Sequence, residues 1–128
     1  MQEKKNPLSP HLQIYKWQIS SLLSITHRIV GVINIVAISA ICFWSLFLLL
    51  GAENYVVLKI FFNSFFGKFI AVGLCWTFSF HILNELRHLF WDMGYGFDLK
   101  ISRITGVLAL VGSFVLTILF YLIGKNIF

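Results

Sequence analysis

The stretch IVGVINIVAISAICFWSLFLLLGA, residues 29–52, decides the fold, because it carries no formal charge over its whole length. About 20 apolar residues span a bilayer as an α-helix that rises about 1.5 Å per residue. Residues 104–124 are also uncharged, and residues 69–84 are uncharged and continue in helical register to Trp91. A helix satisfies its own backbone hydrogen bonds in lipid, so these segments predict an all-α membrane protein with three transmembrane helices.

The composition supports a membrane protein over a soluble domain. Of the 128 residues, 59% are hydrophobic and 12% are charged, whereas soluble domains carry about 25% charged residues. So short a chain cannot hide this much apolar surface in one core, so lipid is an expected partner. The first span is too long for a cleavable signal peptide. The absence of an Arg- and Ser-rich presequence favours a bacterial inner membrane, with the mitochondrial inner membrane as the alternative.

The net charge of +5 is distributed unevenly along the chain. Seven of the ten basic residues precede the first span or surround the connection between the second and third spans, which places them on one side. The positive-inside rule therefore predicts an inside N-terminus and an outside C-terminus, and this placement argues against nucleic acid as a partner. The seven basic residues are Lys4, Lys5, Lys16, Arg28, Arg87, Lys100 and Arg103, against Lys59, Lys68 and Lys125 outside.

We expect one domain over residues 1–128, with helices at about 21–51, 66–92 and 103–124. Residues 1–20 contain Pro7 and Pro10, which disfavour helix, so an extended segment at the membrane interface is expected there. Ser20 or Ser21 is a candidate cap for the first helix. The connection after Gly51 is expected to be an outside loop, and MGYGFDLK, residues 93–100, a glycine-containing turn.

Ionisable residues interrupt the apolar pattern of the second span, HILNELRHLFWD, residues 81–92. Such residues cost roughly 2.5–3.5 kcal/mol each on insertion scales, so they indicate function. His81 and His88 are two helical turns apart and share a face, which Asp92 joins. His81 lies ~16 Å from the end of the helix at Asp92, which is near the middle of the bilayer.

The first span places Ser24, His27 and Arg28 at an inner-leaflet depth similar to that of Arg87 and His88. A histidine that faces a helix-bundle interior is a natural axial ligand of haem iron, and nearby cations suit haem propionates. A serine and an arginine could also hold the carbonyl oxygens of a quinone. Each residue has a structural alternative. The arginines could be interfacial anchors, His88 an interfacial histidine, and Ser24 could bond to its own helix.

In these residues and their spacing, the sequence resembles the cytochrome b556 membrane-anchor subunits of succinate dehydrogenase, respiratory complex II. Their pattern is approximately S-x-x-H-R-x-x-G in the first helix and H-x-x-x-G-x-R-H-L-x-W-D in the second. PLSPHLQIY, residues 7–15, also looks like the family, and the resemblance covers the whole chain. The positions that match are Ser24, His27, Arg28, Gly31, His81, Arg87, His88, Leu89, Trp91 and Asp92.

The resemblance implies a role in transferring electrons from succinate to ubiquinone. The chain would form half of a heterodimeric anchor bundle with a second membrane-anchor subunit, and would dock an iron–sulfur subunit and a flavoprotein subunit. It implies haem b shared between the two anchors, with His81 as an axial ligand of the iron. It further implies that Ser24 and Arg28 bind ubiquinone, and that His27, Arg28 and His88 lie near the haem propionates.

One position departs from the family pattern, because Glu85 stands where the family usually has glycine. Glutamate adds bulk and a possible charge, and we expect it to pair with His88 or with a cation of a partner chain. Three other functions stay open from the sequence. They are a fumarate reductase anchor, a structural anchor without cofactor, and a small proton-conducting protein that uses His81, Glu85 and His88.

Overall fold

The computed structural model describes residues 17–51 and 53–127, the side chains of 126 and 127 excepted. The described residues form helices and no strand. Three of the helices are long and apolar enough to cross a membrane, which confirms the prediction of an all-helical chain with three candidate spans. The helices are α1 (Ile19–Leu49), α2 (Glu53–Asn63), α3 (Phe65–Asp92) and α4 (Leu99–Ile127).

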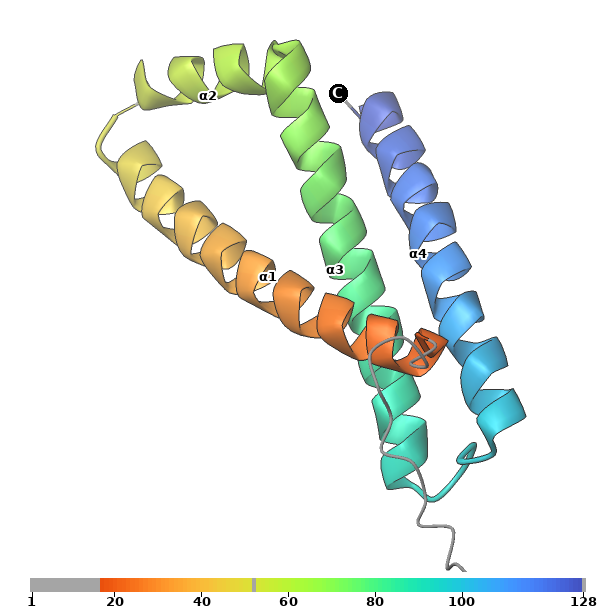
Figure 1. Cartoon of the computed structure of the whole chain (residues 1–128). Coiled ribbons are helices and arrows are strands. Elements are labelled where there is room, and N and C mark those ends of the chain that lie inside the picture. Colours follow the sequence, from red (N-terminus) through yellow and green to blue (C-terminus); the bar gives the residue numbers. More distant parts are fainter. Residues whose placement is uncertain (1–16, 52, 128) are drawn as a thin grey trace, which may run out of the picture.

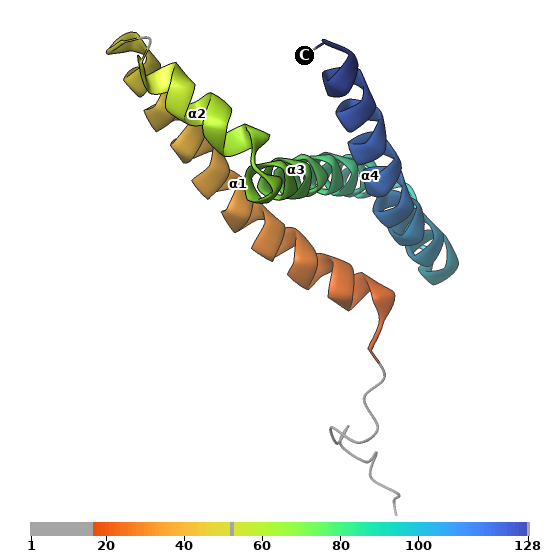
Figure 2. The same ribbon diagram turned by 90° about the horizontal axis from the view of Figure 1, so that it is seen from above.

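Helix α3 lies between α1 and α4, as the view from above shows (Figure 2). Helices α3 and α4 run side by side along most of their lengths, whereas α1 crosses α3 obliquely (Figure 1). The two helices α1 and α3 are therefore close near the start of α1 and diverge toward Leu49. Helix α2 spans the gap between their far ends (Figure 1).

The connection after the first span, which was expected to be a loop, contains the 11-residue helix α2. No proline or glycine interrupts residues 53–63, so nothing in this segment opposes a helix. Asn54 ties its start to α1, because the Asn54 Nδ2 donates to the carbonyl oxygen of Phe47 at 2.9 Å. Ser64 then caps α3, accepting from the backbone N–H of Gly67 at 3.1 Å. The side chain of Ser64 thus separates α2 from α3.

The ends of the first and last spans differ from the sequence prediction. Helix α1 begins at Ile19 and is preceded by Gln18, which makes no side-chain cap, so neither Ser20 nor Ser21 caps it. Helix α4 begins at Leu99 instead of near 103, because the chain reverses within a tight turn. Gly94 and Gly96 adopt positive φ angles of 85° and 83° there, a conformation that glycine adopts without steric cost. The expected extended segment at 1–20 falls almost entirely outside the described residues.

The small interior of the bundle is centred on Leu23, Val30 and Phe80, which come from α1 and α3. Buried polar residues lie beside it, and Asn34 links the two helices by donating from its Nδ2 to the Thr77 carbonyl oxygen at 3.4 Å. Most large apolar side chains of the spans are nevertheless exposed. A bundle with so much apolar surface outside suits lipid or further helices as its surroundings.

Candidate functional site

Three histidines from two helices form a column where α1 crosses α3. The ring of His27 stacks on that of His81, with centroids 4.4 Å apart and planes 12° from parallel. On its other side His27 lies 5.3 Å from the ring of His88. The sequence placed His27 at the depth of His88, whereas the structure places it between His88 and the deeper His81. The oblique crossing of α1 brings this about.

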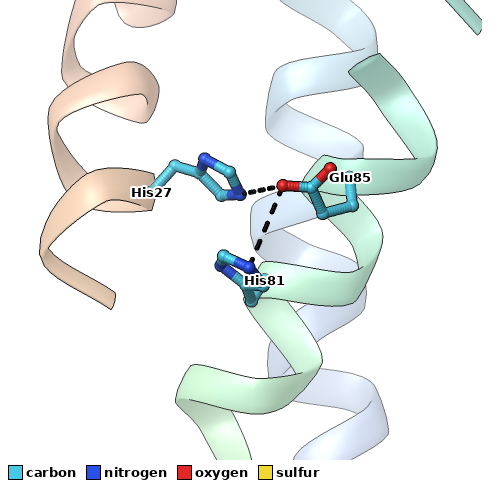
Figure 3. Close-up of side chains that lie close together, drawn as sticks. All are labelled: His27, His81 and Glu85. Atoms are coloured by element: carbon cyan, nitrogen blue, oxygen red, sulfur yellow. Dashed lines mark ion pairs between the residues drawn. The ribbon is translucent and has the colours of Figure 1, made fainter. Parts of the chain in front are cut away.

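Glu85 joins this column through its carboxylate (Figure 3). Its Oε1 lies 3.0 Å from the His27 Nε2 and 3.9 Å from the His81 Nε2. The shorter contact is an electrostatic approach without the alignment of a hydrogen bond, since the buried His27 Nε2 has no hydrogen-bond partner among the described residues. Of the two partners considered for Glu85, the pairing with His88 is wrong, because the carboxylate lies beside His27 and His81 and makes no ion pair with His88 among the described residues. The His88 Nδ1 lies 2.8 Å from the Asn84 carbonyl oxygen.

His81 borders an open, mainly apolar cleft on the surface of α3. About a third of its side chain is exposed (32%), while its Nδ1 is buried without a hydrogen-bond partner in the described chain. The ring faces Gly31 on α1, where an added Cβ would lie 3.4 Å from the His81 Cε1, in ordinary van der Waals contact. The cleft encloses about 320 Å³ and is lined by His81, Ile82, Glu85, Leu86 and Leu89.

A second cleft, between α1 and α3, contains Ser24 and His88. Ser24 is exposed and makes no hydrogen bond within the described residues, whereas Ser39 and Ser45 bond to carbonyl groups of their own helix. The hydroxyl of Ser24 is therefore available to a ligand, contrary to the alternative that it bonds to its own helix. The cleft encloses about 400 Å³ and is lined by Ser20, Ser21, Ser24, Ile25, Asn84, Arg87, His88 and Trp91.

The sequence did not single out Ser20, Ser21, Asn84 and Trp91 as lining residues. The two serines stood out only as possible helix caps, although their spacing from Ser24 is typical of one helix face. Asn84 is fully buried. Its side-chain Nδ2 lacks a hydrogen-bond partner in the part of the chain that the structure describes. An unpaired buried amide beside a cleft is a signal that only the tertiary structure provides.

Arg87 and Arg28 occupy different surroundings. Arg87 is buried and donates to Thr105 and Ser102 of α4 at 3.0–3.2 Å, and its guanidinium lies 4.0 Å from the ring centre of Trp91. Its donors are thus mostly used within this chain. Arg28 is exposed and has no hydrogen bond or ion pair within residues 17–51 and 53–127. It lies next to His27 in the sequence but does not line the cleft that holds Ser24.

The chain is similar to proteins of one membrane-protein family. Residues 2–120 match the family model described as "Succinate dehydrogenase/Fumarate reductase transmembrane subunit". The chain is 44% identical to the succinate dehydrogenase cytochrome b556 subunit of Rickettsia felis, over 91% of each chain. It is 33% identical to the subunit of that name from Paracoccus denitrificans, over 88% of this chain and 87% of the relative.

A third relative extends the comparison. The succinate dehydrogenase cytochrome b560 subunit of Reclinomonas americana is 36% identical, over 91% of this chain and 85% of the relative. The matches span nearly the full length of both proteins, and they include the helices that carry the histidine column. The chain therefore belongs to the family of succinate dehydrogenase and fumarate reductase transmembrane subunits.

Proposed function

We propose that this chain anchors succinate:ubiquinone oxidoreductase in the bacterial inner membrane, holds haem b and forms part of the site where ubiquinone is reduced. One observation carries the proposal, namely the juxtaposition of two clefts with different chemistry. One cleft is apolar and offers the imidazole of His81, and the other offers the hydroxyl of Ser24 and the ring of His88. His27 lies between the histidines of the two clefts, in ring contact with both.

The residues around His81 fit a haem axial ligand. An imidazole that is partly exposed on an apolar face can reach iron outside its own helix, and the other side of the His81 ring faces Gly31 of α1. Bound haem b would supply a one-electron redox centre. The cations for its propionates would be Arg28 together with His27 and His88. Glu85 must turn its carboxylate aside, because that carboxylate lies 3.9 Å from the Nε2 of His81.

Ser24 and Arg28 are the proposed quinone-binding residues. Quinone reduction consumes two electrons and two protons, so the site needs hydrogen-bond donors and a source of protons. The Ser24 hydroxyl can donate to a quinone oxygen or relay a proton from water. Arg28 has a permanent charge and five N–H donors, and no partner within the described chain occupies them. It can therefore hold a quinone oxygen or a haem propionate.

The proposal includes the orientation of the chain in the membrane and its partner subunits. The excess of Lys and Arg before α1 and around the α3–α4 turn favours an inside location for these segments and an outside C-terminus. The iron–sulfur and flavoprotein subunits would dock on that inner side and deliver electrons toward Ser24. A second membrane-anchor subunit would cover part of the apolar surface that the three spans leave exposed, and lipid would cover the rest.

Substitution of Ser24 and Arg28 in the assembled complex tests the quinone site. Ser24→Ala and Arg28→Leu should each reduce succinate–ubiquinone activity about tenfold or more, since one lost hydrogen bond to a reacting group costs ~1–3 kcal/mol. Succinate oxidation with an artificial acceptor that takes electrons before the quinone site should survive. Ser45→Ala, which removes a hydroxyl bonded to its own helix at the far end of α1, is the matched control.

His81 variants separate the two parts of the proposal. They should change the reduced-minus-oxidised haem spectrum first and quinone turnover less. Near-normal ubiquinone reduction in both the Ser24 and the Arg28 variant would overturn the quinone assignment, and an unchanged haem spectrum in His81→Ala would overturn the haem assignment. The family description also includes fumarate reductase, and the rates of succinate oxidation and fumarate reduction by one preparation decide the physiological direction.

A further inference from the structure

We propose that His27, His81 and Glu85 form a binding site for a divalent transition-metal ion, best suited to Zn²⁺, in the haem-free chain. The proposal shares His81 with the proposed haem site but does not depend on haem binding. Its ligands are one imidazole nitrogen from each histidine and one carboxylate oxygen, and these three atoms lie within 4.8 Å of one another. No other group of this kind occurs in the part of the chain that the structure describes.

The distances are near those of a zinc site. Ligand atoms at ~2.0–2.1 Å from a tetrahedral Zn²⁺ lie ~3.3 Å from each other. The His27 Nε2 is 3.0 Å from the Glu85 Oε1, and the His81 Nε2 is 3.9 Å from the same oxygen. The widest separation in the set is within 4.8 Å. Because the rings of His27 and His81 are stacked 12° from parallel, both imidazoles must turn so that their nitrogens point at one ion. Two histidines and a glutamate with an open fourth position form a ligand set that zinc enzymes use.

The side chains are free to make this adjustment. The Glu85 side chain is 57% exposed, so its carboxylate can rotate. The His27 Nε2 lies 3.0 Å from the Glu85 Oε1 and has no other close polar partner among the described residues, so an ion that binds both atoms displaces only this one contact. The His81 ring lies beside Gly31, so it is close to α1. His88 does not belong to the set, because it is not among the residues whose ligand atoms converge within 4.8 Å.

The chemistry of the ligands selects the class of ion. Imidazole nitrogens favour Zn²⁺, Cu²⁺ and Ni²⁺, whereas Ca²⁺ and Mg²⁺ prefer oxygen ligands. The bound ion would link α1 to α3 through His27 on one helix and His81 with Glu85 on the other. The same nitrogen of His81 cannot bind Zn²⁺ and haem iron together, so the two occupants exclude each other. A glycine at position 85, as in the family pattern, would leave only two ligands.

Zinc titration of haem-depleted complex tests the site. The complex is produced without a histidine tag in a host unable to make haem, and Zn²⁺ is titrated in competition with a coloured chelator. We expect the wild-type complex to bind one more Zn²⁺ ion than the Glu85→Gln complex at the same free Zn²⁺ concentration. The apparent affinity of this site for Zn²⁺ should fall about 100-fold or more in Glu85→Gln and His27→Gln, since changes at residues that only support a metal ligand already lower metal affinity 10–100-fold. The difference between wild type and variant isolates this site, because the other subunits are common to both.

The controls are Glu53→Gln, an exposed carboxylate on α2, and His11→Gln, which lies outside the described residues. Both should bind Zn²⁺ like the wild type, and haem-loaded complex should lack the additional ion. Equal Zn²⁺ binding in wild type and Glu85→Gln, or binding unaffected by haem, would refute the proposal. If haem-depleted complex does not assemble, the full chain in detergent takes its place. Haem content and quinone activity of haem-replete Glu85→Gln test the proposed function separately, since both should persist there.

Discussion

Replacing Arg87 by methionine should loosen the packing of α3 against α4. Met is unbranched and apolar, so it keeps much of the side-chain volume and removes every donor. The wild-type guanidinium donates to the Ser102 carbonyl and hydroxyl oxygens at 3.0 Å and to the Thr105 hydroxyl at 3.2 Å. It also lies 4.0 Å from the ring centre of Trp91. All of these contacts are lost in Arg87→Met.

The expected loss of stability is about 2–4 kcal/mol. Hydrogen bonds between transmembrane helices contribute ~0.6 kcal/mol on average and up to ~1.7 kcal/mol. A partly desolvated cation–π contact adds ~0.5–2 kcal/mol. The loss is moderated because a buried charge, which is costly to desolvate, is removed at the same time. The Ser102 carbonyl also keeps the hydroxyl of Thr105 as a donor at 3.2 Å.

The measurement is an SDS titration of the full chain in mixed micelles, followed by tryptophan fluorescence. Arg103→Met is the matched control, because Arg103 is an exposed arginine of α4 and should change stability by less than ~0.5 kcal/mol. A double-mutant cycle with Ser102→Ala should give a coupling energy of about 1 kcal/mol. Unfolding of Arg87→Met at the wild-type SDS fraction, or a coupling energy of zero, would refute the reasoning.

Two further predictions concern the far end of the bundle and its orientation. Gly67→Ala should disrupt the corner between α2 and α3, because the new Cβ would overlap the backbone carbonyl of Phe61. The measurement is hydrogen exchange, which should become faster for the backbone amides of α2. Exchange at the wild-type rate there would contradict the prediction. Tyr95 can be replaced by a single cysteine in a chain from which Cys42 and Cys75 have been removed. This cysteine should react with a membrane-impermeant reagent only from the inner side of the membrane. Labelling from the outer side alone would reverse the proposed orientation.

The sequence by itself determined the class of fold, because the cost of an unpaired backbone group in lipid leaves a long uncharged stretch one structure, a helix. It also selected the polar residues inside the spans, since such residues are rare in lipid. The sequence could not give the helix ends to the residue. Gln18 precedes α1 without a side-chain cap. Helix α4 begins at Leu99 and not near residue 103, because the chain reverses in a tight turn at Gly94 and Gly96.

The tertiary structure alone decided which polar residues meet. Contacts within α3 follow from its periodicity, but the contacts of His27 depend on the angle at which α1 crosses α3. That angle stacks His27 on His81 and brings its Nε2 to Glu85, for which the sequence offered His88 or a cation of a partner chain. The packing of α3 against α4 likewise decides that Arg87 donates to Ser102 and Thr105. A crossing angle arises from the packing of two helix surfaces, and residue spacing along one helix does not contain it.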